Sequence, residues 1–233
     1  MSTFLELCQD VARQSGTLAG GIALPTTVGQ SGRAEKIVDW VKSAWVDLQN
    51  ERQDWRWMRR AFTADLSIGT QCYTAAALSI DRHSAWVEDR SNYRPFTVYD
   101  GSIGQTDQRE IRQIPYELWQ RRWNRFAPSH QRPTEYAISP AREVCVGPPP
   151  DKAYKLTGEY RLAPQILAAD ESIPEMPDQF HKLITWGAMK LLAMSDESEP
   201  TYTFADAKFR EMHYALCSDQ LPQVDMRRES ALV

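Results

Sequence analysis

Apolar residues recur at helical spacing near both ends of the chain. Within residues 31–50, apolar side chains fall at i, i+3, i+4, i+7, i+8 and i+11, starting at Ile37. This spacing predicts an amphipathic helix with one buried face. Shorter patterns of the same kind predict helices over residues 3–14, from 177 to about 192, and over 202–217. Both ends of the chain are therefore expected to be helical.

The middle of the chain, residues 55–162, loses the helical period and gains turn residues. Its clearest strand is 154–162, where four apolar side chains share one face: Tyr154, Leu156, Tyr160 and Leu162. Such alternation predicts an antiparallel sheet with one exposed face. A shorter strand is expected at 143–146, because the Gly-Pro-Pro-Pro run at 147–150 cannot continue a ladder. Residues 115–123 are expected to form a short helix with proline at its first position.

These patterns together predict an α+β fold, in which a bundle of N- and C-terminal helices accompanies a central antiparallel β domain. The predicted divisions are the N-terminal helices (1–54), the β-rich domain (55–165), the C-terminal helices (166–218) and an extended tail (219–233). The tail shows no period, so we expect it to order only on a partner. The Gly-, Thr- and Pro-rich residues 14–32 are expected to be a flexible loop.

Composition and charge exclude several classes of protein. Hydrophobic residues make up 42% and charged residues 25% of the chain, as in ordinary soluble globular proteins. The net charge of -4 argues against a duplex-binding protein held by phosphate neutralisation. No basic segment followed by an apolar run begins the chain, and the longest uncharged stretch, 14–32, is broken by Gly and Pro. We expect a soluble protein that is made in a reducing cytoplasm, with no membrane partner.

No pattern of metal-binding or catalytic residues is found. The four cysteines, Cys8, Cys72, Cys145 and Cys217, are more than sixty positions apart, so neither a zinc site nor a small disulfide scaffold is expected. The four histidines have no partner at ligand spacing, and Gly29–Gly32 lacks the lysine of a phosphate loop. Carboxylates cluster near Asp170 and Asp196. We interpret both clusters as solvated turns, and a hydrolase built on them is the weakest alternative. No enzyme activity and no cofactor are therefore predicted.

Eight tryptophans in 233 residues are a surplus, and several lie beside arginines. In residues 109–125, aromatic and arginine side chains alternate in a way that suits single-stranded nucleic acid. The same residue types are enriched at protein interface hot spots. Because the chain is acidic overall, we favour a protein interface and keep a single-stranded nucleic-acid-binding module as the alternative. The residues expected to supply exposed interface are Trp55, Trp57, Arg59, Trp86, Trp119, Arg121, Arg122 and Trp123.

Several segments resemble the head-to-tail adaptor proteins of tailed bacteriophages. Residues 32–41 (GRAEKIVDWV), Trp45 and residues 54–58 (DWRWM) resemble the start of those proteins. Further pieces follow in the same order in the second half, at residues 133–136, 144–151, 154–160 and 173–181. The resemblance lies in the order of these pieces and covers most of the chain.

The resemblance implies a structural virion protein without enzymatic activity, located at the head–tail interface after assembly in the bacterial cytoplasm. It implies a ring of about twelve copies, a long embracing loop, and contacts with the portal protein, neighbouring subunits and tail or nozzle proteins. DNA would pass through the ring without specific binding, which an acidic lumen would favour. In this family the C-terminal segment commonly docks on the portal. The corresponding anchors here would be Leu221, Val224, Met226, Arg227, Arg228 and Leu232.

Overall fold

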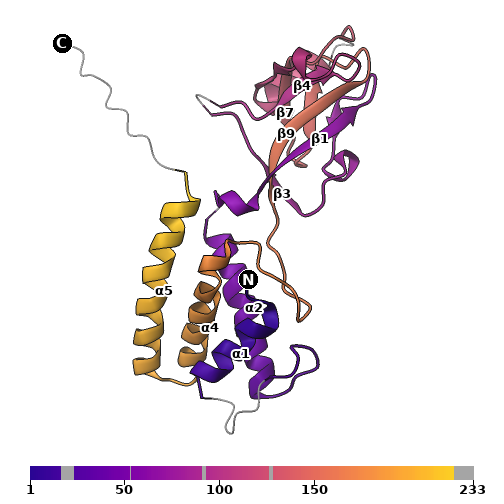
Figure 1. Ribbon diagram of the computed structural model, residues 1–233. Helices are drawn as coiled ribbons and strands as arrows, with labels where there is room; N and C mark the ends of the chain where they lie inside the picture. The colour runs from indigo at the N-terminus through magenta and orange to yellow at the C-terminus, as the bar shows by residue number, and fades with distance from the viewer. Residues whose placement is uncertain (17–23, 53, 91–92, 126–127, 223–233) are drawn as a thin grey trace, which may run out of the picture. The chain divides into compact units, whose positions relative to one another are not determined.

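A computed structural model of the chain describes residues 1–16, 24–52, 54–90, 93–125 and 128–222. Two compact units are present (Figure 1). The helical unit combines residues 1–58 with 164–233, and the β unit is the intervening segment 59–163. Of the predicted flexible loop at 14–32, residues 17–23 lie outside the described residues.

The helical unit contains the four predicted helices. They are α1 (Phe4–Gln14), α2 (Arg33–Glu51), α4 (Lys182–Ser195) and α5 (Glu199–Gln220). Helix α4 contacts the other three helices, and its buried side chains belong to the same core cluster as theirs. Among the residues in this core, Trp45 and Leu183 have no exposed surface. Two segments 130 residues apart in sequence therefore share one hydrophobic core, as the sequence predicts.

The N-terminus of α1 is fixed by a capping box. The Thr3 hydroxyl accepts a hydrogen bond from the Glu6 backbone N–H at 3.2 Å, and the Glu6 carboxylate accepts one from the Thr3 N–H at 3.0 Å. Backbone hydrogen bonds from Phe4 and Leu5 to the loop at Ser172 and Asp170 then tie α1 to the C-terminal half of the unit.

The first sheet of the β unit is built around its longest strand, β9 (Tyr154–Leu162). Strand β1 (Arg59–Leu66) pairs with one edge of β9, while β3 (His83–Trp86) and β4 (Thr97–Asp100) pair with successive parts of the other edge. Strand β5 (Arg109–Glu110) extends the sheet beyond β4. All these pairings are antiparallel, as the sequence predicts.

The second sheet has the order β2-β8-β7-β6. Its strands are β2 (Cys72–Tyr73), β6 (Arg112–Gln113), β7 (Glu135–Ile138) and β8 (Val144–Gly147). Strands β6 and β7 pair in parallel over two residues, which is an exception within the predicted antiparallel domain. The reason is the long connection between them, which contains the predicted short helix and allows the chain to return in the same direction.

Side chains from both sheets form the core of the β unit. Phe96, Val98, Tyr136 and Leu156 have no exposed surface. Gly158 of β9 allows two aromatic rings to approach the backbone, since a Cβ at this position would lie 2.7 Å from Phe96 and 2.8 Å from Phe62. The predicted α+β fold, with terminal helices packed together and a central β region, is confirmed.

We expect the β unit to lose stability in acid because of two carboxylates at one end of β4. Asp100 accepts hydrogen bonds from Lys152 and Ser102, and Asp107 accepts one from Arg132 at 2.7 Å; these contacts hold both carboxyl pKa values below the ordinary value. Because the folded-state pKa lies below that of the unfolded chain, the stabilisation is present above a pH of about 4 and is lost as the pH falls through the folded-state pKa.

The measurement is the midpoint of urea unfolding at neutral and acidic pH. Asp107→Asn should show a smaller fall than the unchanged protein. Asp65→Asn, which removes a more exposed partner of Lys155, is the control and should leave the fall intact. An identical fall in all three proteins would contradict this assignment.

Candidate functional site and interaction surfaces

The predicted Arg- and Trp-rich segment forms a short helix that is anchored in the β unit. Helix α3 (Tyr116–Trp119) continues into a π-helical turn, Gln120–Asn124. The Trp119 side chain is 2% exposed and packs in a cluster with Ile114, Ala137 and Cys145. The ring of Tyr116 stacks on it with centroids 5.8 Å apart. Trp119 therefore belongs to the subunit's own core.

Trp123 and Arg122 both contact the carboxylate of Glu135. The Trp123 indole N–H donates to Glu135 Oε2 at 2.9 Å, and the Arg122 guanidinium forms a salt bridge with the other oxygen of the same carboxylate. The Trp123 ring covers Gly147, where an added Cβ would lie 2.4 Å from the ring. Arg121, by contrast, is exposed and forms no salt bridge with a described residue.

Trp55 and Trp57 lie at the end of the helical unit's N-terminal half. Their rings stack with centroids 4.5 Å apart, and both belong to the helical core. The Trp55 indole N–H donates to the Leu48 carbonyl at 3.0 Å, which satisfies a backbone group in the last turn of α2. Both indoles therefore close one end of the helical core.

Trp86, at the end of β3, packs among aromatic side chains of the β core. Its ring lies 5.5 Å from that of Phe62 and 6.0 Å from that of Phe96. Its indole N–H donates to the Arg142 carbonyl at 2.7 Å. Trp86 is 4% exposed.

The expectation that the tryptophans outside the helical stripes form exposed surface is wrong for Trp55, Trp57, Trp86 and Trp119. Sequence neighbours suggested exposure because they are charged, but the apolar partners of these rings come from distant segments. The exposed members of the predicted set are Arg59, Arg121 and Arg122, and Trp123 is half-buried. Arg59 forms a salt bridge with Glu159 and lies over the ring of Tyr93 at 5.2 Å.

Residues 109–125 do not present the stacked aromatic surface that a single-stranded nucleic acid would need. Five arginines are exposed in the segment: Arg109, Arg112, Arg121, Arg122 and Arg125. The aromatic partners are occupied, since Trp119 is buried, Tyr116 stacks on Trp119, and Trp123 covers Gly147. Within the described residues, the segment therefore offers charge for phosphates without a platform for bases.

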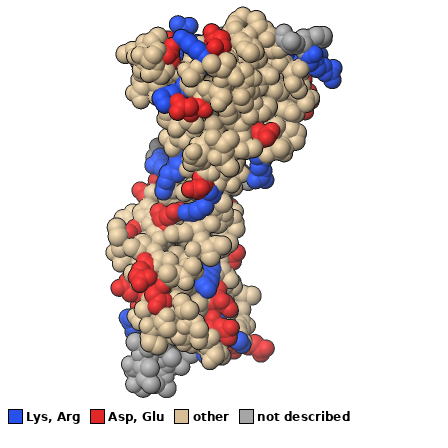
Figure 2. Space-filling view, turned by 90° about the vertical axis from the view of Figure 1, so that its right-hand side faces the viewer, with Lys and Arg blue, Asp and Glu red and all other residues tan. Residues whose placement is uncertain are grey.

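The two units differ in charge. The β unit contains 15 Lys and Arg and 12 Asp and Glu, a formal net charge of +3. The rest of the chain contains 12 Lys and Arg and 19 Asp and Glu, which gives a formal net charge of -7. Figure 2 shows acidic side chains spread over the visible face of the helical unit. The acidic balance of the whole protein thus comes from the helical unit.

Helices α4 and α5 expose large apolar side chains outside the predicted interface set. Met194, Phe204 and Tyr214 are 65%, 56% and 79% exposed. A groove of about 570 Å³ is lined by residues of α2, α4 and α5, among them Gly187, where an added Cβ would lie 3.1 Å from Ala44. Phe204 and Tyr214 lie outside the apolar stripe of the last helix. Their positions off the helical period are the sequence feature that could have predicted their exposure.

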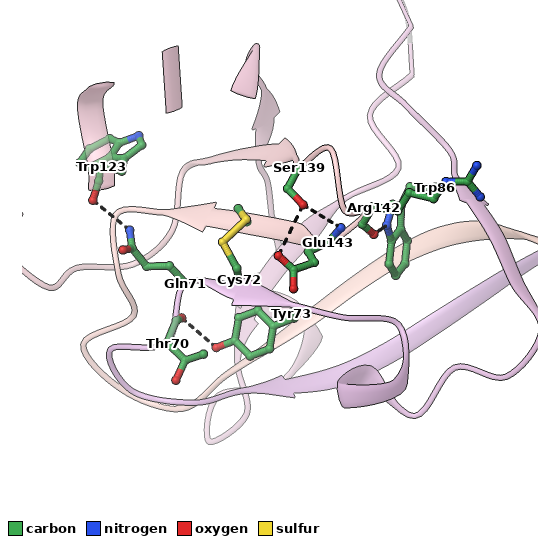
Figure 3. Close-up of a disulfide and its surroundings, with 10 residues drawn as sticks. Thr70, Gln71, Cys72, Tyr73, Trp86, Trp123, Ser139, Arg142 and Glu143 are labelled. Carbon is green, nitrogen blue, oxygen red and sulfur yellow. Dashed lines mark hydrogen bonds between the residues drawn. A yellow bond between two sulfur atoms is a disulfide. The ribbon is translucent and has the colours of Figure 1, made fainter. Parts of the chain in front are cut away.

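Two cysteines of the β unit form a disulfide (Figure 3). Cys72 of β2 lies directly opposite Cys145 of β8, with their Cα atoms 4.0 Å apart. The spacing of the cysteines argues against a small disulfide scaffold, and it gives no indication of this single bond. The two sulfurs are brought together by the register of β2 against β8. The separation of 73 positions along the sequence does not predict that register. Cys8 and Cys217 are free thiols, and burial raises the pKa of the Cys8 thiol to about 12.

The carboxylates considered for catalysis serve as structural ligands of nearby segments. Asp170 accepts a hydrogen bond from the Thr27 backbone N–H at 2.7 Å and another from its hydroxyl, so it orders the segment before α2. Asp196 pairs with Arg33 of α2, and this contact lowers the pKa of Asp196. These contacts explain both carboxylates without catalysis.

His181 has no exposed surface and links the N-terminal residues to the segment before α4. Its Nδ1 accepts a hydrogen bond from the Ser2 N–H at 3.1 Å, and its Nε2 lies 3.0 Å from the Met176 carbonyl, to which it donates. Both ring nitrogens are used, so His181 is a structural hydrogen-bonding residue rather than a metal ligand.

Of the predicted portal-docking tail, Leu221 lies within the described residues. Leu221 packs partly buried against the helical core at the end of α5, where its N–H donates to the Cys217 carbonyl. The other predicted anchors, Val224, Met226, Arg227, Arg228 and Leu232, lie outside the described residues. No helix in the described parts of the chain has the length and apolar content to cross a membrane.

Comparison with known proteins gives one family. The sequence matches the family described as SU10 adaptor protein over residues 2–232, which is nearly its whole length. A search of curated proteins found no match to this chain.

Proposed function

Because the chain belongs to the SU10 adaptor protein family, whose members are phage head–tail adaptors, we propose that it forms a ring of about twelve copies between the portal and the tail. The observation that carries this proposal is the family match over residues 2–232. The family is one of structural virion proteins and not of enzymes. The portal protein, neighbouring subunits and tail or nozzle proteins are the proposed partners.

The outer surface of α5 is the proposed contact with a neighbouring subunit. A closed ring uses a heterologous interface, so each copy needs two different complementary faces. Phe204 and Tyr214 are more than half exposed on this helix, and Met194 is exposed at the end of α4. Exposed aromatic and Met side chains are typical of protein interfaces. Arg59, Arg121, Arg122 and Trp123 are the corresponding proposed contacts of the β unit, together with the long embracing loop of the family.

The charge of the helical unit supports a position next to the DNA path. The net charge of this unit is -7, so its surface repels the phosphate backbone. It would not displace the counterions of DNA, and DNA would therefore slide past without being held. We therefore assign the acidic surface of the helical unit to the lumen of the ring.

The C-terminal tail is the proposed portal anchor. Leu221 at the end of α5 is already packed on the helical core, so the following residues begin from a fixed point. Val224, Met226 and Leu232 would supply apolar contacts, and Arg227 and Arg228 would supply charge.

The test is co-sedimentation of the full-length protein with purified portal rings. We expect a stoichiometric complex with the full chain, and a complex at least tenfold weaker when residues 219–233 are removed, because the anchors are lost while α5 keeps all but its last two residues. Circular dichroism of the shortened protein checks that its fold is kept. Absence of a complex with the full chain would overturn the proposed function, whereas equal binding by both proteins would overturn the role of the tail.

The same complex tests the α5 contact. Phe204→Ser combined with Tyr214→Ser should reduce the number of copies retained on each portal, because the neighbour-to-neighbour contact is weakened. Val28→Ser is the control, since Val28 is 64% exposed on a different segment of the helical unit. Native mass spectrometry gives the copy number for each variant, and unchanged occupancy with the double variant would exclude α5 from the interface.

A further inference from the structure

Cys72 and Cys145 lie opposite each other on adjacent strands of the second sheet, and their side chains project from the same face of that sheet. The Val146 N–H donates to the Gln71 carbonyl at 2.8 Å, which makes the adjacent pair, Cys72 and Cys145, a non-hydrogen-bonded pair. At such positions the two side chains are at their closest approach across antiparallel strands. The two sulfurs therefore remain neighbours by backbone register, with or without a bond between them.

A third ligand atom lies beside the two sulfurs. A carboxylate oxygen of Glu143 and both sulfur atoms lie within 4.8 Å of one another. Glu143 precedes Cys145 by two positions, so both side chains project from the same face of the extended segment. Among the described residues, this is the group in which three or more His, Cys, Asp or Glu side chains place possible ligand atoms within 4.8 Å of one another.

The Glu143 carboxylate is oriented by its own turn and has no cation beside it. The Ser139 hydroxyl accepts the Glu143 backbone N–H at 3.1 Å and lies 3.5 Å from Glu143 Oε2 (Figure 3). The adjacent Arg142 side chain instead donates to the Ser84 carbonyl at 2.9 Å. Within the described residues Glu143 forms no salt bridge, so a half-buried carboxylate faces two sulfurs without a compensating charge.

The surroundings limit access to this group. Cys145 has no exposed surface and lies in the cluster with Trp119, while Cys72 and Glu143 are half-buried. The group is thus closed on the side of the sheet's core and open to solvent on the side of Cys72 and Glu143. An ion bound here would have three protein ligands and one position for water.

We propose that Cys72, Cys145 and Glu143 of the reduced protein form a binding site for one zinc ion. Two thiolates and a carboxylate are ligands that Zn²⁺ accepts in a tetrahedral arrangement. In the reducing cytoplasm, two small thiol molecules cleave the disulfide and leave as one small disulfide, and the chain gains two thiols. Binding of Zn²⁺ then releases the two thiol protons. A small disulfide can later oxidise the pair, which reforms the Cys72–Cys145 bond, yields two small thiols after proton uptake, and expels the ion.

This site lies outside the α5 surface and the C-terminal tail, although Trp123 packs against the same cluster as the two cysteines. It is supported by the register of β2 and β8 and by the position of Glu143, and it does not depend on ring assembly. The zinc-bound state would hold the short edge strand β2 on β8 during assembly, as the disulfide does after oxidation.

The test is metal titration of the full-length protein reduced with a phosphine, which does not compete as a thiol ligand. Cd²⁺ is the first probe, because cadmium–thiolate bonds give an ultraviolet charge-transfer band, and competition with Zn²⁺ follows. We expect one Cd²⁺ per chain with this band, displacement by Zn²⁺, and no band with the oxidised protein. Absence of the band in the reduced protein would overturn the proposal.

Two variants locate the site. Glu143→Gln keeps the size of the side chain and should weaken Cd²⁺ affinity at least tenfold, whereas Glu117→Gln, at an exposed position of the same unit, should leave it unchanged. Cys72→Ser should abolish the charge-transfer band at one equivalent. Equal affinities of the two glutamine variants would remove Glu143 from the site, and a band that persists in Cys72→Ser would place the ion elsewhere. Either result overturns the three-ligand site without bearing on the adaptor function.

Discussion

Replacing Trp119 by alanine is expected to lower the free energy of unfolding of the isolated chain by about 3 to 5 kcal/mol, the usual cost of truncating a buried tryptophan. The side chain is 2% exposed and contacts Ile114, Ala137 and Cys145. These residues come from three segments, so the cavity would lie where α3 meets the second sheet. The measurement is denaturant unfolding of the monomer, followed by near-ultraviolet circular dichroism.

Two control variants separate core packing from interface contact. Trp119→Phe should cost much less than Trp119→Ala, because it keeps an aromatic ring and removes an indole N–H that has no hydrogen-bond partner among the described residues. Arg121→Ala should leave monomer stability within about 0.5 kcal/mol, as is usual for exposed positions. If Trp119→Ala left the monomer unchanged and affected assembly alone, Trp119 would be an interface residue as the sequence suggested.

Cleaving the Cys72–Cys145 disulfide is expected to lower the stability of the β unit by about 2 to 4 kcal/mol. The bond joins residues separated by 73 positions, so it removes many conformations from the unfolded β unit. Strand β2 has just two residues in register with β8, and few backbone hydrogen bonds would replace the covalent link. The helical unit contains neither cysteine of this disulfide, so its stability should be unaffected.

The measurement is urea unfolding with and without a phosphine reductant, in the presence of a metal chelator that keeps the reduced pair empty. Cys72→Ser should show no dependence on the reductant and should unfold at the same urea concentration as the reduced protein. A reductant effect that persists in Cys72→Ser would have to come from elsewhere. Equal stability of the oxidised and reduced proteins would show that the disulfide does not constrain the unfolded state appreciably.

The helices could be predicted because their information is local. The apolar period from Ile37 to Leu48 identifies the buried face of α2, and Pro177 marks the approach to α4. The long strand β9 was equally visible, since alternation from Tyr154 to Leu162 continues over nine residues. The parallel pairing of β6 with β7 could not be predicted, because each strand is short and the direction of pairing depends on a connection that carries no period.

The candidate site shows the same division. The tryptophans were correctly recognised as a surplus, but their burial depends on partners distant in sequence, as when the Trp86 indole meets the Arg142 carbonyl. Phe204 and Tyr214 could be recognised as apolar residues outside the stripe of the last helix, whereas their exposure follows from the way α5 packs on α4.

The sequence by itself determined the α+β fold, the helical ends and the membership of an adaptor family, since periodicity and the order of short motifs along the chain are properties of the sequence. The tertiary structure decided which aromatic rings are buried, which unit carries the acidic charge, and that Cys72, Cys145 and Glu143 come together. These last features depend on strand register and on contacts between distant segments, which residue spacing does not encode.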